Sequence, residues 1–368
     1  MTAFDYQPRT RVIFGDGAVA QLTRLARELG FSRTLLVADR GLVDAGHVAT
    51  ATKMLEAAGV LVSPFHDFGP NPDTDQVEAG RRFANGTDYT SIVALGGGSS
   101  MDLAKAINIV THNPGSIADY QGYGKGTGLL APMVAIPTTA GTGSEAQSYA
   151  IIAHSGTHMK MAIGDPGAAF RAAILDPALT VSQPAFITAT AGYDAISHAV
   201  ESLVCSKANP FSQCFAREAW RLLSECFERV LANPDDITAR GAMLTGANLA
   251  GASIENSMLG AAHACANPLT AKFGIAHGSA IALMLPHVVR WNLSVAEALY
   301  TELFAGDLAA RLEEFAAAAQ LPRRLSDYGV KLAELPGLAA GAAGQWTGRF
   351  NPRPFDSAAA LELYQCAF

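Results

Sequence analysis

The sequence predicts two domains, a doubly wound parallel α/β sheet over residues 1–178 and an all-helical domain over residues 179–368. In the first domain, short apolar runs alternate with amphipathic segments, which is typical of a parallel sheet with helices on both faces. In the second, long Ala-rich stretches carry apolar residues at a helical spacing of about 3.6 residues. A chain of 368 residues is long enough to form a buried core in each domain.

Strands and helices are expected to alternate along the first domain. The runs expected as strands are 11–14, 33–38, 60–65, 89–95 and 133–136. The helices expected between them are a segment that ends near Gly30 and the segments 48–58, 74–84 and 101–110. The run 33–38 is almost continuously apolar, as expected for a strand that helices cover on both faces.

Proline-containing pairs are expected to divide the second domain into separate helices. These pairs are Asn209-Pro210, Asn233-Pro234, Asn267-Pro268 and Leu285-Pro286. The segment 211–231 is predicted to be a helix because its apolar residues can share one face. The Ala/Gly-rich segment 335–344 is expected to be a loop.

The charge balance limits the partners of this protein. The formal net charge is −7 and no basic stripe is available to follow a phosphate backbone, so we expect no nucleic-acid partner. Charged residues make up 16% of the chain, compared with about 25% in an average soluble protein. This low fraction predicts large cores and some surface covered by a partner subunit. No apolar run is long enough to span a membrane, so no membrane partner is expected either.

The five cysteines indicate a reducing compartment. They form no CxxC pair and their number is odd, so we expect free thiols in a cytoplasmic protein rather than a disulfide framework. The first residues, Met1 to Tyr6, lack the features of a signal peptide, which agrees with this expectation.

Two loops of small and polar residues follow expected strands. Gly96–Ser99 lies between a strand and a helix, where glycines let a phosphate approach the free N–H groups of the helix start. Pro137–Glu145 follows the run 133–136, so both loops would lie at the carboxyl edge of the sheet, where ligands bind in α/β proteins. The alternative interpretations are a tight structural turn and a flexible polar loop.

Asp39 and Lys160 are further candidates for nucleotide binding. Asp39 stands at the carboxyl end of the run 33–38, where a carboxylate can accept a hydrogen bond from a ribose 2′-hydroxyl and would repel a 2′-phosphate. It therefore favours NAD over NADP, unless it only caps the following helix. Lys160 could contact ribose or phosphate, or else be an ordinary surface lysine.

Asp194 and His198 are the first of four candidate metal ligands. They are four residues apart in a segment predicted to be helical, so their side chains lie on one face. Such a pair can hold a metal ion, although it also occurs as a simple surface hydrogen bond. His263 and His277 lie among small apolar residues, where a charged imidazole would not be left without a partner. Three imidazoles and one carboxylate suit a divalent first-row transition metal.

These motifs occur together in a known family. The run Gly96-Gly-Gly-Ser-Ser-Met-Asp-Leu-Ala-Lys105, the loop Pro137–Glu145, the set Asp194, His198, His263 and His277, and Asn351-Pro-Arg-Pro354 resemble the iron-containing (group III) alcohol dehydrogenases across essentially the whole chain. The resemblance implies a dehydroquinate synthase-like fold, with a Rossmann-like dinucleotide-binding domain at 1–178 and a helical metal-binding, catalytic domain at 179–368. It also implies that the metal and the nicotinamide meet between the domains.

The resemblance further implies roles for individual residues. The implied metal ligands are Asp194, His198, His263 and His277. The positions that match NAD(P) contacts in the family are Gly97, Gly98, Ser99, Asp102, Thr138, Thr139, Thr142 and Lys160. A bound Fe²⁺ or Zn²⁺ would act as a Lewis acid on the alcohol oxygen while hydride passes between the carbinol carbon and nicotinamide.

Asn267 departs from the family pattern. Many members carry a histidine at this position, four residues after the one matching His263, and it is often assigned to proton relay. The Asn267 amide can hydrogen-bond a substrate oxygen or a water, but it cannot take up a proton. The proton would then leave through water, the cofactor ribose or another group.

The leading hypothesis is an NAD(H)-dependent, metal-dependent alcohol dehydrogenase or aldehyde reductase that acts on a small, uncharged substrate. One alternative is a maleylacetate reductase, whose dicarboxylate substrate would need basic residues near the metal; residues 256–278 offer only Lys272. Another is a dehydroquinate synthase-type lyase, which needs several Lys or Arg and a different metal set. A nucleotide-binding relative without turnover is a third.

Two further properties are open to more than one interpretation. The same four ligands serve Fe²⁺ and Zn²⁺, so the sequence does not choose between the metals. The apolar strand at 11–14 could pair across a two-fold axis, and a homodimer is therefore expected.

Overall fold

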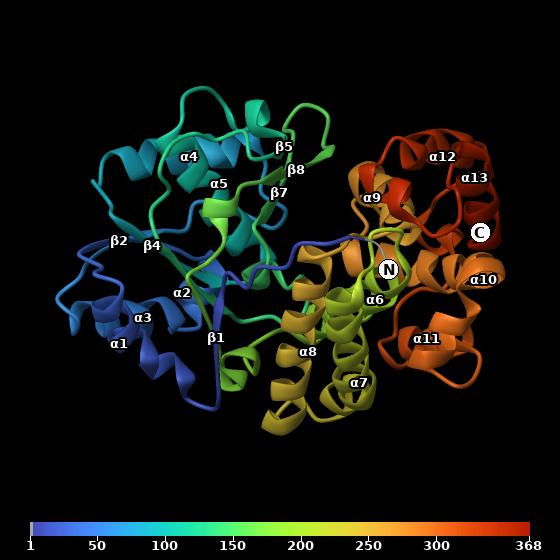
Figure 1. Ribbon diagram of the computed structural model, residues 1–368, viewed down its shortest axis with the longest axis horizontal. Helices are drawn as coiled ribbons and strands as arrows, with labels where there is room; N and C mark the ends of the chain where they lie inside the picture. Colours follow the sequence, from blue (N-terminus) through green and yellow to red (C-terminus); the bar gives the residue numbers. More distant parts are fainter. Residues whose placement is uncertain (1–2) are drawn as a thin grey trace. The chain divides into compact units, whose positions relative to one another are not determined.

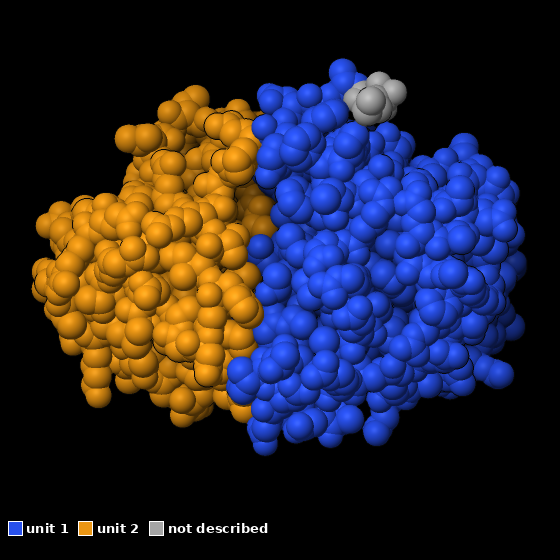
Figure 2. Space-filling model, turned by 60° about the horizontal axis from the view of Figure 1, so that its bottom comes forward, with its two compact units in different colours: residues 1–6, 140–142, 184–368 blue, residues 7–139, 143–183 orange. Residues whose placement is uncertain are grey.

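The computed structural model describes residues 3–368 and divides into two compact units. The sheet unit consists of Gln7–Thr139 and Gly143–Gln183 (unit 2 in Figure 2), and the helical unit consists of the N-terminal residues up to Tyr6, Ala140–Thr142 and Pro184–Phe368 (unit 1 in Figure 2). The prediction that the N-terminus lacks a signal peptide concerns Met1 to Tyr6, and two of these residues, Met1 and Thr2, lie outside the described residues. Between residues 3 and 368, no helix is both long and apolar enough to cross a bilayer.

A six-stranded parallel sheet forms the centre of the sheet unit, which confirms the predicted fold class. Its order across the sheet is β1 (Arg11–Phe14), β9 (Ala172–Leu175), β6 (Met133–Pro137), β4 (Ser91–Gly96), β2 (Arg33–Val37) and β3 (Leu61–Phe65). All of its strand pairs are parallel. Gly96 pairs in register with Pro137, so the loops after β4 and β6 begin at the same edge.

Helices cover both faces of this sheet because successive strand residues point to opposite faces. On β4, Val93 and Leu95 belong to the core shared with α1 (Leu22–Glu28) and α3 (His47–Glu56), whereas the alternate residues point to the other face. Figure 1 draws α1 and α3 on one side of the sheet and α4 (Thr74–Asn85) and α5 (Gly98–His112) on the other. Burial of each large aliphatic side chain contributes about 1.5–3 kcal/mol to folding.

A second, smaller sheet was not predicted from the sequence. It consists of β5 (Gly122–Tyr123), β8 (Lys160–Gly164) and β7 (Tyr149–Ala153), with β7 and β8 antiparallel. The short helix α2 (Arg40–Asp44) was not predicted either. The 3₁₀ segments are η1 (Ala18–Gln21), η2 (Ile117–Tyr120), η3 (Ser144–Ala146), η4 (Pro166–Ala168), η5 (Pro177–Thr180), η6 (Leu325–Tyr328), η7 (Leu332–Glu334) and η8 (Trp346–Phe350).

The helical unit consists of α-helices and 3₁₀ segments, as predicted for the second domain. Its helices are α6 (Ala185–Val204), α7 (Pro210–Ala232), α8 (Ile237–Glu255), α9 (Ala261–Phe273), α10 (His277–Leu303), α11 (Leu308–Ala318), α12 (Leu335–Ala343) and α13 (Ser357–Cys366). The predicted helix at 211–231 is α7, which begins at a capping box in which the Asn209 side chain accepts from the N–H groups of Phe211 and Ser212.

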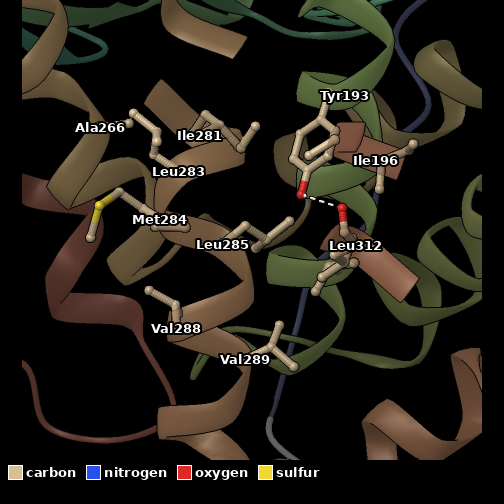
Figure 3. Packing of buried hydrophobic residues seen from close by; sticks show 14 of the residues in the cluster. Tyr193, Ile196, Ala266, Ile281, Leu283, Met284, Leu285, Val288, Val289 and Leu312 are labelled. Carbon is tan, nitrogen blue, oxygen red and sulfur yellow. Dashed lines mark hydrogen bonds between the residues drawn. The ribbon is translucent and has the colours of Figure 1, made fainter. Parts of the chain in front are cut away.

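The core of this unit holds α6 in place. Tyr193 of α6 is fully buried, and its hydroxyl donates a hydrogen bond of 3.1 Å to the carbonyl of Leu312 in α11 (Figure 3). Figure 3 also shows Ile196 of α6 and residues of α10, including Leu285 and Val289, in the same cluster. Because Tyr193 precedes Asp194, this packing fixes the turn of α6 that carries the first candidate ligand.

Two of the predicted helix breaks are wrong. Pro268 lies inside α9 and Pro286 inside α10. A proline removes one helical N–H and usually costs about 3 kcal/mol, but tertiary packing can outweigh this cost. Both prolines are buried, and the hydroxyl of Tyr364 donates a 2.6 Å hydrogen bond to the carbonyl of Cys265, in the turn that Pro268 interrupts.

The expected loop at 335–344 is also wrong, because Leu335–Ala343 forms α12. Alanine is the best helix former, and the buried residues of this segment recur at helical spacing. They are Leu335, Leu338, Ala339 and Ala342. Packing of this face against its neighbours stabilises a helix in spite of the two glycines within it.

Candidate functional site

Helix α6 presents Asp194 and His198 on one face. Both residues are buried, with relative exposures of 5%. His277 is the first residue of α10, and the glycine that follows it allows α10 to approach α6 closely. A side chain at Gly278 would overlap the backbone of Thr190, one turn before Asp194. The glycine in the Ala-His-Gly sequence therefore brings His277 to the same place.

Three of the four predicted ligands, the histidines, lie around a carboxylate oxygen of the fourth, Asp194. The Nε2 atoms of His198, His263 and His277 lie 3.4, 3.6 and 3.8 Å from Oδ1 of Asp194. The ligand atoms of Asp194, His263 and His277 all lie within 4.8 Å of one another. The rings of His198 and His263 are nearly parallel, with centroids 5.0 Å apart. Residues from α6, α9 and α10 thus converge on one point.

This cluster fits a bound cation. In a tetrahedral site with metal–ligand bonds of about 2.1 Å, neighbouring ligand atoms are about 3.4 Å apart. The three distances to Oδ1 of Asp194 are close to this value. Oδ1 of Asp194 and Nε2 of His263 are buried without a hydrogen-bond partner among the described residues, although such atoms are normally satisfied. A divalent ion at the centre would satisfy both.

The electrostatics of the cluster keep the carboxylate ionised. Burial alone would raise the pKa of Asp194, but the imidazoles of His198, His263 and His277 together hold it well below its usual range. Burial lowers the pKa of His198 to about 4, so this imidazole is neutral near pH 7. Burial also acts to lower the pKa of His263, but the carboxylates of Glu201 and Asp194 outweigh it and raise that pKa to about 9.

The sequence analysis missed Glu201, which lies beside the cluster. This residue of α6 is buried, and its carboxylate contacts Nδ1 of His263. Its position, seven residues after Asp194, places it on the same helix face, and that spacing could have revealed it.

Asn267 lies one turn after His263 on α9 and is buried. Its amide nitrogen donates a 3.0 Å hydrogen bond to the side-chain oxygen of Gln345. The buried side chain of Gln345 therefore fixes the orientation of the Asn267 amide.

In the sheet unit, the two predicted loops start side by side at the carboxyl edge of the sheet. The N–H of Thr138 donates to the carbonyl of Gly96 at 3.0 Å, and Gly97 lies against the side chain of Thr139. Helix α5 begins at Gly98, and no side chain caps it. Its first N–H groups and the threonine side chains therefore occupy one small region of the edge.

Behind this edge, Asp102 takes part in a buried polar network. Its carboxylate accepts a 2.6 Å hydrogen bond from the hydroxyl of Ser144, and Nζ of Lys105 lies 4.0 Å away. Burial raises the pKa of Asp102, while Lys105, Ser144 and, more weakly, Lys160 oppose that shift. Lys105 itself is fully buried and donates to the carbonyls of Ser144 and Tyr149. This lysine thus ties the loop after β6 to α5.

The other predicted nucleotide residues are more scattered. The carboxylate of Asp39 caps α2 by accepting from the N–H of Leu42 at 3.2 Å, which is the alternative interpretation of that residue. The hydroxyl of Ser99 accepts from the N–H of Asn71 at 3.1 Å. Lys160 begins β8 of the small sheet, and Thr142 groups with the helical unit.

Together, a doubly wound domain with small residues at its carboxyl edge and a helical domain with an Asp/His/His/His cluster are the features expected of a metal-dependent dehydrogenase. Residues 8–177 match the family model for iron-containing alcohol dehydrogenases, and residues 188–368 match the model for the C-terminal part of Fe-containing alcohol dehydrogenases. The chain belongs to the iron-containing alcohol dehydrogenase family.

Individual relatives are similar over almost their full length. The chain is 34% identical to the NAD-dependent methanol dehydrogenase of Bacillus methanolicus, with 96% of each chain covered. It is 32% identical to the 1,3-propanediol dehydrogenase of Citrobacter freundii, with 99% of each covered. A crystal structure of 1,3-propanediol oxidoreductase superposes with a TM-score of 0.95 at 31% identity, and both chains are completely covered. The protein is therefore a metal-dependent alcohol dehydrogenase, as its sequence motifs indicated.

Proposed function

We propose that this enzyme transfers hydride reversibly between a small, uncharged alcohol and NAD, with the corresponding aldehyde or ketone as the oxidised product. The convergence of three imidazoles on the Asp194 carboxylate carries this proposal. The NAD-dependent methanol dehydrogenase relative supports the choice of cofactor.

Asp194, His198, His263 and His277 are the proposed metal ligands. A divalent ion held there supplies Lewis acidity that lowers the pKa of the substrate hydroxyl. One anionic ligand leaves the site with a net positive charge, which favours an anionic oxygen. The small residues around His263 exclude water from its side of the site.

The carboxyl edge of the sheet is the proposed NAD site. NAD held there would supply the hydride acceptor. The free N–H groups at the start of α5 suit a pyrophosphate, and the proposed contacts are Gly97, Gly98, Ser99, Asp102, Thr138, Thr139, Thr142 and Lys160. Asp39 can cap α2 with one carboxylate oxygen and accept from a ribose hydroxyl with the other, which favours NAD over NADP.

Asn267 is the proposed polar contact in place of a proton-relay histidine. Its side chain is held by Gln345, so it offers a fixed amide to a substrate oxygen or a water. Because an amide does not titrate, the proton leaves by another route, through water or the ribose hydroxyls.

The proposed metal is Fe²⁺ or Zn²⁺, since both accept this ligand set. The family name supports iron. Three imidazoles and a carboxylate without a thiolate are equally suited to zinc.

A small, uncharged substrate is favoured over the dicarboxylate of a maleylacetate reductase and the phosphate-bearing substrate of a dehydroquinate synthase-type lyase. The lysine nearest His263 and His277 in the sequence is Lys272, and its ammonium forms a 3.1 Å ion pair with Glu334. This pairing makes it a poor partner for an anionic substrate.

We further propose a cytoplasmic homodimer. Strand β1 is an edge strand of the large sheet, and its Val12 and Phe14 are 47% and 55% exposed. An apolar edge strand can pair with a second copy across a two-fold axis. All five cysteines are free, which supports a reducing compartment.

The proposed function can be tested on anaerobically purified protein by metal analysis, followed by NADH oxidation with small aldehydes, ketoacids and maleylacetate. We expect about one Fe or Zn per chain and turnover of small aldehydes. Turnover confined to maleylacetate would replace the proposed substrate class. Protein that binds NADH but stays inactive with restored Fe²⁺ or Zn²⁺ would contradict the proposed activity.

A further inference from the structure

Glu201 is a buried carboxylate that directly contacts a proposed metal ligand without being one itself. It lies on α6 three residues after His198, so it shares the helix face of Asp194 and His198. It is only 4% exposed. One carboxylate oxygen contacts Nδ1 of His263, and the other accepts a 2.8 Å hydrogen bond from the N–H of Ala262.

The start of α9 depends on side chains from other segments. Its N-cap residue is Gly260, and no N-cap side chain accepts a hydrogen bond there. Instead, Glu201 accepts from Ala262, and Oδ1 of Asn351 accepts from Ala261 at 3.3 Å. A side chain at Gly260 would lie 2.9 Å from Oδ1 of Asn351 and 3.0 Å from Glu201, so glycine permits this close approach.

Glu201 and Asn351 thus bind adjacent N–H groups of the same helix end, but they differ in one respect. Glu201 reaches the ring of His263. The side chain of Asn351 is occupied by Asn292 and by the carbonyl of Arg353. Both residues therefore cap α9, but of the two only Glu201 also contacts the proposed metal ligand His263.

We propose that Glu201 is a positioning residue that sets the tautomer and orientation of His263 for metal binding. When the metal displaces the second ring proton of His263, the imidazole carries one proton, and a carboxylate at Nδ1 holds that proton there. Nε2 then keeps its lone pair, and it faces Oδ1 of Asp194 at 3.6 Å. The second oxygen of Glu201 fixes the backbone next to His263, so both the ring and its attachment point are held by one side chain.

Replacement of Glu201 by glutamine should keep its role as a helix cap but change its effect on the His263 tautomer. The glutamine oxygen can still accept from the N–H of Ala262, but its amide nitrogen then faces Nδ1 of His263. Because that nitrogen is a donor, the favoured tautomer of His263 reverses and its proton moves to Nε2. The proton would then occupy the position where the metal should bind.

The role of Glu201 rests on the metal site proposed above, and the two can be tested separately by chelator competition for Zn²⁺ or Fe²⁺. At about pH 9, where proton competition at His263 is weak in both proteins, we expect E201Q to bind the metal about 10–100-fold more weakly than the unsubstituted protein. N351A is the matched control: it removes the other acceptor at the start of α9, so it should lower the unfolding temperature and leave metal affinity within about 3-fold.

Each outcome decides one of the two proposals. Failure of the unsubstituted protein to bind metal would overturn the metal site itself. Tight metal binding by the unsubstituted protein together with equal affinities for E201Q and N351A would reduce Glu201 to a helix cap and overturn only its positioning role.

A second measurement does not require a substituted protein to fold. In Zn²⁺-loaded protein, ¹⁵N NMR of the histidine side chains should show His263 protonated at Nδ1 and unprotonated at Nε2. The opposite pattern would overturn the proposal.

Discussion

Nε2 of His263 lies 3.6 Å from Oδ1 of Asp194, although the two residues belong to different helices, α9 and α6. Both atoms are buried without a hydrogen-bond partner among the described residues. A protein seldom leaves a buried acceptor unsatisfied, because this costs about 1–3 kcal/mol. The pair therefore has the form of an incomplete coordination shell, and the predictions below depend on that interpretation.

Removal of one imidazole should separate metal binding from nucleotide binding. We expect His277→Ala to lose most bound metal and at least about 100-fold in kcat/KM, because the remaining three ligands bind the ion less tightly. The dissociation constant for NADH, measured by fluorescence titration, should stay within about 3-fold. His287→Ala, on the same helix but outside the cluster, is the matched control and should keep its metal. Normal turnover by His277→Ala would contradict the ligand assignment.

Metal binding should release a proton near neutral pH. The carboxylates of Glu201 and Asp194 raise the pKa of His263 to about 9, so without metal this ring is protonated at pH 7. The metal needs the deprotonated nitrogen, so affinity should fall about tenfold for each pH unit below 9. Calorimetry in buffers of different ionisation enthalpy should detect about one released proton at pH 7 and fewer above pH 9. Affinity that does not change between pH 6 and 9 would contradict this coupling.

Two substitutions at Asp39 can distinguish its role as a helix cap from a role in cofactor choice. Asn is as good an N-cap as Asp, so Asp39→Asn should preserve α2 while it removes the charge. We expect the ratio of kcat/KM for NADP over NAD to rise about tenfold in this variant. Asp39→Gly should relax the preference as well. Asp44→Asn, at the other end of α2, controls for the loss of one charge, and an unchanged ratio in Asp39→Asn would show that Asp39 is only a cap.

Introduction of a titratable group at position 267 should change the pH profile. Asn267→His adds an imidazole with an ordinary pKa near 6.5, so kcat/KM should acquire an inflection between about pH 6 and 7. Asn267→Ala is the control because it also removes the hydrogen bond to Gln345 but adds no base. Identical pH profiles for the two variants would exclude a proton-relay position at residue 267.

The large sheet and the shared helix face of Asp194 and His198 could be predicted because their signals are local. The predicted run 89–95 indicates a buried strand, which the structure places at Ser91–Gly96, and the Asp194/His198 spacing indicates one helix face. By contrast, the helices around Pro268 and Pro286 and the helix at Leu335–Ala343 are stabilised by tertiary packing. Local preferences predict a break or a loop there, and packing overrides them.

The contacts of Glu201 and Asn351 at the site also could not be predicted from local sequence signals. Their partners, His263 and Ala261, are 62 and 90 residues away in the sequence, so no short motif connects them. The family resemblance drew attention to Asn351 without a role. Only the three-dimensional structure places both residues at the start of α9.

The most direct test of the metal centre is anomalous diffraction from crystals of the anaerobically purified protein, recorded on both sides of the iron and zinc absorption edges. We predict a single strong peak per chain, about 2.0–2.2 Å from Oδ1 of Asp194 and from Nε2 of His198, His263 and His277. A peak at another position, or no peak here in metal-loaded, active protein, would contradict the proposed site.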